Sequence, residues 1–576
     1  MIDDAGGSGP TTGDPALQDA GRADAQGPGP ARHDTIVVGA GIAGLTVAHE
    51  LAARGYRVLV LEAAERVGGT AARLDVDGLS LDAGAESFAV RGGSVAELIG
   101  ELGLADDIVD PNPAGAWLQL PDGAGRRSAV PLPKRTLLGI PSTPLAQDVI
   151  DALGWRGALR AHLDRLMPVL RIGTDDALGP LVRRRMGQRV LDRLVAPLAG
   201  GVYSADPELL DIAVVAPGLN GGITRAGSLS GGVAFVLEER AAAAGAAEGR
   251  TPGSAVQGLR GGIHRLAERL AERAREHRAE IRTGVRVRSA AETDDGWLVT
   301  SDAGSHAASS LVVALPEPEA QRLLAPLSRS SSSGRRPDGE ADAASRSSSS
   351  GRRPRIETTD DAHEHGLDTP DSVGLLDQRD DAVTVELVTL VLPAGAIEGD
   401  PRGTGVLVAA DATQVRAKAM THATAKWAWL REAAGGREIV RFSYGSGGGA
   451  PATEGLDDAA ATALALADAS AIFGTALPQP VASARVRWQQ GQPSSTIGAR
   501  DRQQALRDAA AAHENLLVVG AAVAGTGLAQ VIPDARRAAL EIRRERFAVQ
   551  GTPWTDDIAP DEAIDMDEAA EEPGEA

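Results

Sequence analysis

The chain has 576 residues, 43% of them apolar, and is long enough for two or three globular domains. Its formal net charge of −21 argues against a nucleic-acid-binding protein, which needs a basic face. The absence of Cys excludes disulfides, thiolate catalysis and Cys-ligated metals. Of 58 basic residues only Lys134, Lys418 and Lys426 are lysines, so a single Arg carries little information.

Residues 1–33 are rich in Gly, Ala, Asp and Pro and have neither a basic start nor an apolar core. We expect a disordered segment here rather than a secretory signal. No apolar run along the chain reaches the roughly 18 residues of a membrane-spanning helix. The default expectation is therefore a cytoplasmic protein, with a peripheral contact to the inner face of the membrane left open.

Residues 35–38, 45–54 and 56–61 predict a strand, a helix and a second strand, which form a βαβ unit. A GxGxxG turn joins the first strand to the helix and consists of Gly39, Ala40, Gly41, Ile42, Ala43 and Gly44. Its glycines permit a tight turn, the approach of a pyrophosphate, and close packing of helix on strand. Glu62 ends the second strand, where an acid can accept ribose hydroxyls. The alternative is a chance Gly-rich turn with a capping Glu.

The next two segments indicate which dinucleotide binds. Residues 62–73 read EAAERVGGTAAR and resemble the E-x(3)-R-x-G-G pattern of the flavoprotein amine oxidase superfamily. Residues 81–87 read LDAGAES and resemble that superfamily's stretch near the flavin ring, although a strand and a turn would also explain them. The resemblance implies an FAD cofactor. It assigns cofactor contacts to Glu62, Ala63, Arg66, Gly68, Gly69, Thr70, Gly84, Ala85, Glu86 and Ser87.

Later segments continue the resemblance in the same order. Residues 258–263 precede a predicted helix, 281–287 resemble a strand whose Val meets the adenine (here Val285), and 311–316 resemble a strand that returns to the sheet. Residues 518–528 read VVGAAVAGTGL and match the last FAD motif, before a helix expected from about Ala529. This match implies cofactor contacts by Gly520, Thr526, Gly527 and Leu528. Backbone N–H groups at a helix start would stabilise negative charge on a reduced flavin.

The predicted fold is α/β, with a Rossmann-like FAD-binding domain, a mixed-sheet substrate domain and an inserted helical domain. We assign residues 34–100, 250–327 and 480–548 to the FAD-binding domain, 101–144 and 382–479 to the substrate-binding domain, and 145–249 to the helical domain. Strands are expected at 383–392, 405–409 and 516–519. The Ser/Arg-rich insertion at 328–381 and the acidic tail at 549–576 are predicted to be disordered. His363 and His365 fall in the insertion, and no metal site is predicted.

Residues 194–210 read LVAPLAGGVYSADPELL. They resemble the EPLxxGIYAGDxxxLS pattern of the protoporphyrinogen and coproporphyrinogen oxidases, and the chain is most similar to the Gram-positive bacterial enzymes that act on coproporphyrinogen III. Residues 131–141 and 426–427 match further pieces, and the resemblance covers 34–327 and 382–548. The chain departs from the pattern at 493–499, where an aromatic residue and a His are missing, and at 525–532. These departures put substrate affinity and turnover in question.

The resemblance implies an FAD-dependent, dioxygen-using oxidase that converts coproporphyrinogen III to coproporphyrin III in haem biosynthesis, with a hand-off to ferrochelatase. The substrate's carboxylates need cationic partners. Arg91, in an ESFxxR context, and Lys134 are the candidates, and a surface role is the alternative for Arg91. No residue is given a catalytic role, and the lone His422 is taken as structural. The open alternatives are a protoporphyrinogen IX oxidase, a related flavin amine oxidase, and a flavin-binding haem-pathway partner with little activity.

Residues 154–193 carry nine Arg and four acidic residues in an otherwise acidic chain. Leu159, Leu163, Leu166 and Leu170 are spaced to form an apolar stripe on one helix. Such a stripe predicts either a weak, salt-sensitive contact with an anionic membrane or the core of the helical domain.

Overall fold

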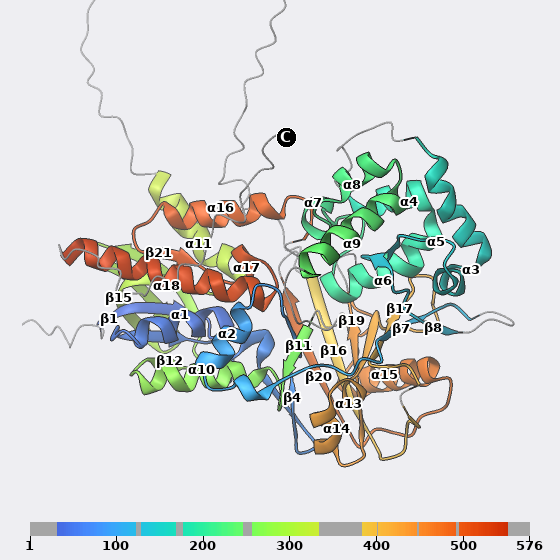
Figure 1. The fold of residues 1–576 in the computed structure, drawn as a ribbon. Helices are drawn as coiled ribbons and strands as arrows, with labels where there is room; N and C mark the ends of the chain where they lie inside the picture. Colours follow the sequence, from blue (N-terminus) through green and yellow to red (C-terminus); the bar gives the residue numbers. More distant parts are fainter. Residues whose placement is uncertain are drawn as a thin grey trace, which may run out of the picture.

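The computed structural model describes residues 32–122, 128–168, 177–245, 256–332, 383–399, 401–445, 449–490 and 495–550. Their arrangement is mixed α/β, as predicted. Figure 1 shows a sheet with its helices on one side of the molecule, and a second sheet below a group of helices on the other. The candidate site is built where these three parts meet.

The first sheet is parallel in its centre and antiparallel at one edge. Its order is β12 (Glu280–Arg282), β2 (Val58–Leu61), β1 (Arg32–Val38), β15 (Gly304–Val313), β14 (Gly296–Ser301) and β13 (Val287–Thr293), and β21 (Leu516–Val518) also pairs with β15. The strands β12, β2, β1, β15 and β21 run parallel. Strand β2 and the last residues of β1 and β15 are apolar because helices cover both faces of the sheet there.

Four helices cover one face of this sheet, and three further helices cover the other. The first group is α1 (Ile42–Ala52), α2 (Ser94–Glu101), α10 (His264–Glu276) and α18 (Leu528–Gln550). The second is α11 (Glu317–Ser332), α16 (Ala499–Ala511) and α17 (Ala521–Ala524). On β1, Val37 packs into the first group and Ile36 and Val38 pack toward the second, as strand alternation requires. The predicted βαβ unit is therefore present.

The second sheet is antiparallel except for one strand pair. Its order is β20 (Ala482–Gln490), β16 (Val383–Leu392), β19 (Glu438–Tyr444), β18 (Ala419–His422), β17 (Gly405–Val408), β7 (Ala116–Gln119) and β8 (Ala129–Pro131). On β19, Val440, Phe442 and Tyr444 enter the core that α15 (Asp458–Phe473) covers. Arg441 and Ser443 therefore point from the opposite face, toward the other parts of the molecule.

Short elements connect the two sheets. They are the hairpin β3 (Arg73–Val76) and β4 (Leu79–Asp82), a small sheet of β5 (Phe88–Ala89), β11 (Val256–Leu259) and β6 (Ile108–Val109), and the helices α13 (Ala423–Lys426) and α14 (Ala428–Ala434). A further pair, β9 (Thr136–Leu137) and β10 (Ile140–Pro141), leads into the helical module.

The helical module joins helices to single turns of 3-10 and π-helix. It comprises α3 (Gln147–His162), η3 (Leu163–Leu166), α4 (Leu178–Met186), α5 (Gln188–Val190), the π-helical η4 (Leu191–Val195), α6 (Ala196–Leu198), the π-helical η5 (Ala199–Tyr203), α7 (Ile212–Val215), α8 (Leu219–Ala226) and α9 (Leu229–Gly245). A buried ion pair between Asp164 and Arg185 fixes η3 against α4. Ser230, on α9, also donates to Asp164 through its backbone N–H at 2.9 Å. These contacts hold the end of α3 in one position.

The structure moves several of the limits that the sequence predicted for the domains and the disordered segments. Strand β20 pairs along its length with β16, so residues 482–490 belong with the second sheet and not with the FAD-binding domain. Strand β1 begins at Arg32, inside the segment expected to be disordered, because its first residues pair with β15. Helix α11 continues to Ser332 and α18 to Gln550, past the predicted limits at 327 and 548. The remainder of the insertion and tail, with His363 and His365, lies outside the described residues, and the other domain limits stay predictions.

Two local predictions were wrong. Residues 281–287 do not form one strand, because they divide between β12 and β13 with Gly284 in a left-handed turn (φ +70°). The Leu stripe does not lie on one helix, since α3 ends at His162 and Leu163 and Leu166 follow in a 3-10 turn. Leu170 lies outside the described residues.

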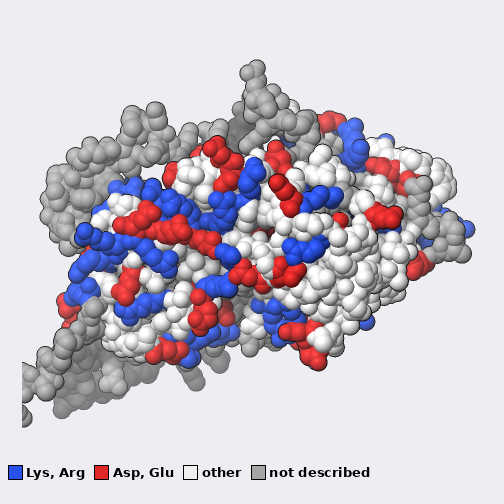
Figure 2. Space-filling model, turned by 90° about the horizontal axis from the view of Figure 1, so that it is seen from below, with Lys and Arg blue, Asp and Glu red and all other residues white. Residues whose placement is uncertain are grey.

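The two sides of the molecule also differ in surface composition. In Figure 2, which views Figure 1 from below, Lys and Arg alternate with Asp and Glu over the side that contains the first sheet. The side that contains the second sheet has a broad uncharged area in this view. Helix α15, which lies on that side, is rich in Ala.

Candidate cofactor and substrate site

The glycine turn after β1 leaves space at one glycine and none at the other two. Gly39 has a φ of +105° and Gly44 is buried, and a Cβ on either would overlap a backbone carbonyl oxygen. Gly41 precedes α1 and would have nothing within 4 Å of an added Cβ. Gly39 and Gly44 therefore shape the turn, while Gly41, Ile42 and Ala43 present the start of α1 to an open space. This division fits a bound pyrophosphate.

Glu62 and the second glycine pair lie against this turn. The Glu62 carboxylate accepts the N–H of Ala40 at 2.7 Å, and its carbonyl accepts the N–H of Val285 at 2.8 Å. The Gly68 N–H donates to Ala40 O at 2.8 Å, and an added Cβ on Gly69 would lie 3.5 Å from Gly41 Cα. Segments 39–44, 62–69 and 285 thus converge, as the resemblance implied, and their cofactor contacts stay predictions.

The residues between Ala63 and Thr70 include exposed side chains. Ala63, Arg66 and Thr70 are exposed, and Arg66 donates to Asp75 at 2.8 Å. The Thr70 carbonyl accepts the N–H of Ala85 at 2.9 Å, which ties the predicted flavin-ring stretch to the glycine pair.

Glu86, in that stretch, joins the first sheet's side of the molecule to the second sheet. Lys426 Nζ, from α13, donates to Glu86 Oε1 at 2.6 Å. Arg441, from β19, lies 3.7 Å from Glu86 Oε2 and donates to Gly84 O at 2.6 Å. Burial tends to raise the pKa of Glu86, but the charges of Lys426 and Arg441 outweigh it and hold the pKa below its usual range. The Glu86 carboxylate is therefore occupied by ion pairs with Lys426 and Arg441. Ser87, the next residue, is half-buried.

The last predicted motif packs on the first. Gly520 has a φ of +91°, and its N–H donates to the buried carboxylate of Asp534 at 3.1 Å. An added Cβ on Gly520 would lie 3.0 Å from the Cβ of Ala43, beside the first turn. Thr526, Gly527 and Leu528 stand at the start of α18. The sequence-distant motifs therefore form one continuous surface around the space at Gly41, and this surface fits a dinucleotide. When bound, a flavin dinucleotide would supply the hydride acceptor.

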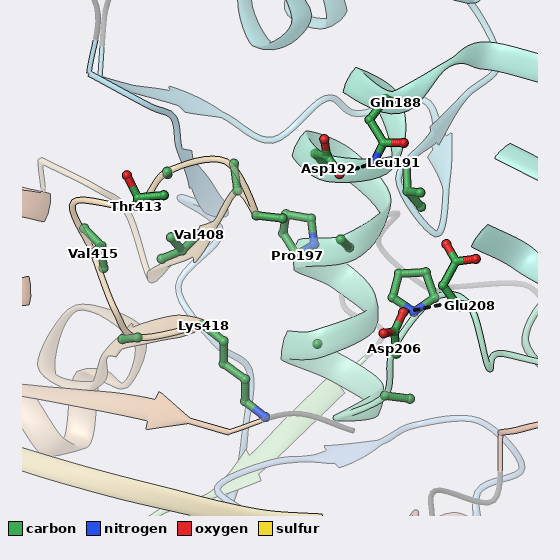
Figure 3. Close-up of a pocket in the computed structure, with 18 of the residues that line it drawn as sticks. Gln188, Leu191, Asp192, Pro197, Asp206, Glu208, Val408, Thr413, Val415 and Lys418 are labelled. Atoms are coloured by element: carbon green, nitrogen blue, oxygen red, sulfur yellow. Dashed lines mark hydrogen bonds between the residues drawn. The ribbon is translucent and has the colours of Figure 1, made fainter. Parts of the chain in front are cut away.

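A cavity of about 750 Å³ lies between the helical module and the second sheet (Figure 3). One wall comes from residues 183–208 and the other from residues 408–418. The first wall includes Gly200, Ala205, Asp206, Pro207 and Glu208 of the segment that resembles the porphyrinogen oxidases. Figure 3 shows the Lys418 side chain extending from the second wall toward the end of this helical segment.

The predicted substrate residues do not meet at this cavity. Arg91 and Lys134 are exposed, and neither is among the described residues that line it. His422 is fully buried and bonds Glu438 through Nε2 at 2.8 Å, which agrees with a structural role. The divergent segment at 493–499 is described from Ser495, and its Ile497 N–H donates to Leu209 O at 2.9 Å. That segment therefore contacts the porphyrinogen-oxidase-like segment.

Sequence reasoning missed four side chains at the junction. Lys426 and Arg441 bind Glu86, Lys418 lines the cavity, and Trp488 Nε1 donates to Ala83 O at 3.1 Å. For two of them the sequence contained a signal, because Lys418 and Lys426 are two of only three lysines in an Arg-rich chain. Arg441 and Trp488 gave no such signal.

Fold and motifs together define a dinucleotide-binding oxidoreductase with a second, side-chain-lined compartment. A family model for flavin-containing amine oxidoreductases matches residues 42–349 and 411–543, and the chain belongs to this family. It is accordingly an oxidoreductase with a flavin cofactor.

Two bacterial relatives of the chain are coproporphyrinogen III oxidases. The chain is 27% identical over 513 residues to a coproporphyrinogen III oxidase of Mycobacterium tuberculosis, which covers 88% of this chain and 96% of the relative. It is 32% identical over 203 residues to a coproporphyrinogen III oxidase of Propionibacterium freudenreichii, over 34% of this chain and 36% of the relative. That second match spans about a third of either protein.

Solved structures share the fold. A protein from Exiguobacterium sp. 255-15 assigned as a protoporphyrinogen oxidase aligns with a TM-score of 0.68 and 24% identity, covering 90% of this chain and all of that one. Putrescine oxidase bound to putrescine aligns with a TM-score of 0.57 and 16% identity, covering 89% and 99%. At these identities the likeness concerns the fold.

The described residues contain neither a membrane-spanning helix nor a metal-binding cluster. None of the described helices combines the length and apolarity needed to span a membrane. No group of three or more His, Asp or Glu among these residues is placed to hold a metal ion.

Proposed function

We propose that this flavin oxidoreductase binds FAD and oxidises coproporphyrinogen III to coproporphyrin III with dioxygen, as a step of haem biosynthesis. The observation that carries the proposal is the position of residues 200–208, which form one wall of the 750 Å³ cavity. The near full-length similarity to a coproporphyrinogen III oxidase supports the same substrate class. Each two-electron oxidation of the substrate would reduce one dioxygen to peroxide.

The chain's own residues would bind and position the reactants. The glycine turns and the N-termini of α1 and α18 would hold the dinucleotide through backbone N–H groups. Lys426 and Arg441 would fix the Gly84–Glu86 segment against the second sheet. Arg91 and Lys134, both exposed, stay the predicted partners of substrate carboxylates, and ferrochelatase stays the predicted recipient of the product.

Turnover by the purified flavin-loaded protein tests this proposal. Coproporphyrinogen III, protoporphyrinogen IX and an amine panel that includes putrescine are supplied in air, and porphyrin fluorescence and peroxide are measured. We expect coproporphyrin III and peroxide to form together. Faster oxidation of protoporphyrinogen IX or of an amine would replace the proposed substrate, and a yellow protein inactive with all of them would indicate a flavin-binding partner.

We also propose a weak contact between the helical module and an anionic membrane, at the inner face of the cell membrane. Leu159 and Leu163 are exposed, Trp155 is 59% exposed and Leu166 is 79% exposed. The inward-packing alternative is therefore wrong for these three leucines. The buried Asp164–Arg185 pair fixes the turn that presents Leu163 and Leu166. Exposed apolar side chains beside Arg residues favour an interfacial contact that salt weakens.

Co-sedimentation with anionic liposomes at low and high salt tests the contact. The double variant Trp155→Ser/Leu166→Ser should sediment less than the wild type at low salt. Val481→Ser, which removes an exposed apolar side chain outside the helical module, is the matched control and should sediment like the wild type. Equal sedimentation of all three proteins, or none at low salt, would contradict the contact.

A further inference from the structure

The cavity between the helical module and the second sheet is bordered by a half-buried lysine, Lys418. Lys418 lines the cavity at the end of the 409–418 loop, and its side chain extends toward the end of the helical segment that forms the other wall (Figure 3). Its Nζ donates to Ser204 Oγ at 3.1 Å, and Ser204 follows the π-helical η5 with a φ of +52°. Lys418 therefore spans the two walls of the cavity.

This ammonium group has no carboxylate partner among the described residues. The acids on the cavity wall have other hydrogen-bond partners: Glu208 pairs with Arg183, Asp206 accepts the Glu208 N–H, and Asp192 accepts from Gln188. Because burial removes water and no acid compensates, the pKa of Lys418 is lowered to about 8. A buried cation without a counter-charge is destabilising, and an anionic ligand would relieve that cost.

The backbone around Lys418 is fixed from both sides. Asp468, on α15, accepts the N–H groups of Arg416 at 3.0 Å and Ala417 at 2.9 Å, and it also accepts Tyr444 OH at 3.0 Å. The Lys418 N–H donates to Ser443 O at 2.9 Å, and its carbonyl accepts the Val408 N–H at 3.1 Å. Lys418 is thus presented by a rigid loop, as a binding residue requires.

We propose that Lys418 binds a carboxylate of the tetrapyrrole substrate and so determines specificity for coproporphyrinogen. The inference rests on the proposed function. Coproporphyrinogen keeps propionate arms where protoporphyrinogen has vinyl groups, so an added cation favours the former. The Gly200–Glu208 segment that resembles the porphyrinogen oxidases forms the opposite wall.

Strands β18 and β19 connect the Lys418 end of the second sheet to the predicted flavin-ring stretch. Lys418 stands directly before β18, and Thr421 is the third residue of that strand. Thr421 pairs with Arg441, whose guanidinium donates to Gly84 O in the predicted flavin-ring stretch.

Binding of coproporphyrin III to the flavin-loaded protein, followed by fluorescence at pH 7, tests the inference. We expect Lys418→Met to weaken binding about tenfold or more and Lys418→Arg to restore most of it. Arg288→Met removes an exposed positive charge on β13 and should bind like the wild type. Protoporphyrin IX binding should change less than coproporphyrin III binding in Lys418→Met.

Two further binding measurements, one at raised pH and one with the tetramethyl ester, separate recognition of the carboxylate charge from packing of the macrocycle. Wild-type affinity for coproporphyrin III should fall as Lys418 loses its proton above about pH 8, whereas Lys418→Arg should keep its affinity at pH 9.5. The tetramethyl ester should bind wild type and Lys418→Met equally. An ester affected as strongly as the acid would overturn the proposal.

Two further outcomes would also overturn it. One is equal coproporphyrin III affinity in wild type and Lys418→Met, or no binding at all. The other is Lys418-dependent binding of free propionate while coproporphyrin III binding ignores Lys418, which would indicate a separate small-carboxylate site. Lys418-dependent porphyrin binding without turnover would leave the inference standing and reject the proposed function. Coproporphyrinogen III turnover that is equal in wild type and Lys418→Met would leave the proposed function standing and reject the inference about Lys418.

Discussion

The cofactor half and the cavity half of this site are built from different materials. Around Gly41 the surface is almost entirely backbone: turns at Gly39 and Gly68, and the start of α1. Around Lys418 the surface is made of side chains from a π-helical segment and a loop that lie about 200 residues apart in the sequence. The first half tolerates change in side chains and not in backbone space. The second half depends on a few side chains whose charges are only partly compensated.

The largest effect is expected from a substitution in the glycine turn of the cofactor half. The added Cβ in Gly44→Ala would overlap the Gly39 carbonyl oxygen. We expect this variant to lose about 3 kcal/mol of unfolding free energy and to lose its bound flavin. Gly41→Ala is the matched control, because its Cβ meets open space. It should unfold like the wild type without flavin but retain much less flavin. Urea unfolding of the apoprotein and flavin absorbance measure the two effects.

Full flavin retention by Gly41→Ala would mean that the space at Gly41 is not used by the cofactor. Similar apoprotein stability in Gly44→Ala would mean that the turn relaxes, and that close helix-strand packing is not required there.

The same contrast explains what the sequence could predict. Residues 39–44 and 62 are contiguous in sequence and work through backbone geometry, so the pattern alone predicted both the βαβ unit and its convergence. Glu86 was found as a motif residue, but its partners lie more than 300 residues further along the chain, Lys426 on α13 and Arg441 on β19. Strand register decides which side chains meet across a sheet, and one sequence does not encode it locally.

The boundary errors have the same origin. Residues 482–490 read equally well as a strand of either sheet, and only pairing with β16 places them. The Leu159–Leu166 spacing fits a helix, but α3 ends at His162, where the Asp164–Arg185 pair anchors a tighter turn. A hydrophobic period does not reveal whether a stripe packs inward, and here Leu159, Leu163 and Leu166 do not.

A middle-sized effect is expected where the two halves join. Glu86→Gln would leave Lys426 and Arg441 without their acid, and we expect a loss of about 2–3 kcal/mol of unfolding free energy. Asp75→Asn is the control, since Asp75 also pairs with two arginines, Arg66 and Arg73, but is exposed, so its loss should cost less than about 1 kcal/mol. Urea unfolding at pH 7 measures both.

The pH dependence of the Glu86 contribution follows from its lowered pKa. The folded protein binds this proton less tightly than the unfolded chain, so the contribution is present above the ordinary carboxyl pKa. It is lost as pH falls through the folded value. The gap between wild type and Glu86→Gln should therefore narrow toward acid pH, and a gap that stays constant would assign the effect to packing.

The smallest expected effect is a gain in unfolding free energy on substitution in the cavity half, whereas the substitutions in the cofactor half and at the junction cause losses. Lys418 is buried without a counter-charge and its pKa is lowered from 10.5 to about 8. Replacing it by Met should therefore stabilise the protein at pH 7, by on the order of 1–3 kcal/mol. Between about pH 8 and 10.5 the unfolded chain binds more protons at this residue than the folded chain, so wild-type stability rises with pH in that window. The advantage of Lys418→Met should then shrink from pH 7 to pH 9.5. Lys134→Met makes the same change at an exposed lysine and should shift stability by less than about 0.5 kcal/mol at either pH. Urea unfolding of the three proteins at both pH values measures this, and destabilisation by Lys418→Met would show that the lysine is a structural link to Ser204 rather than a charge kept for a ligand.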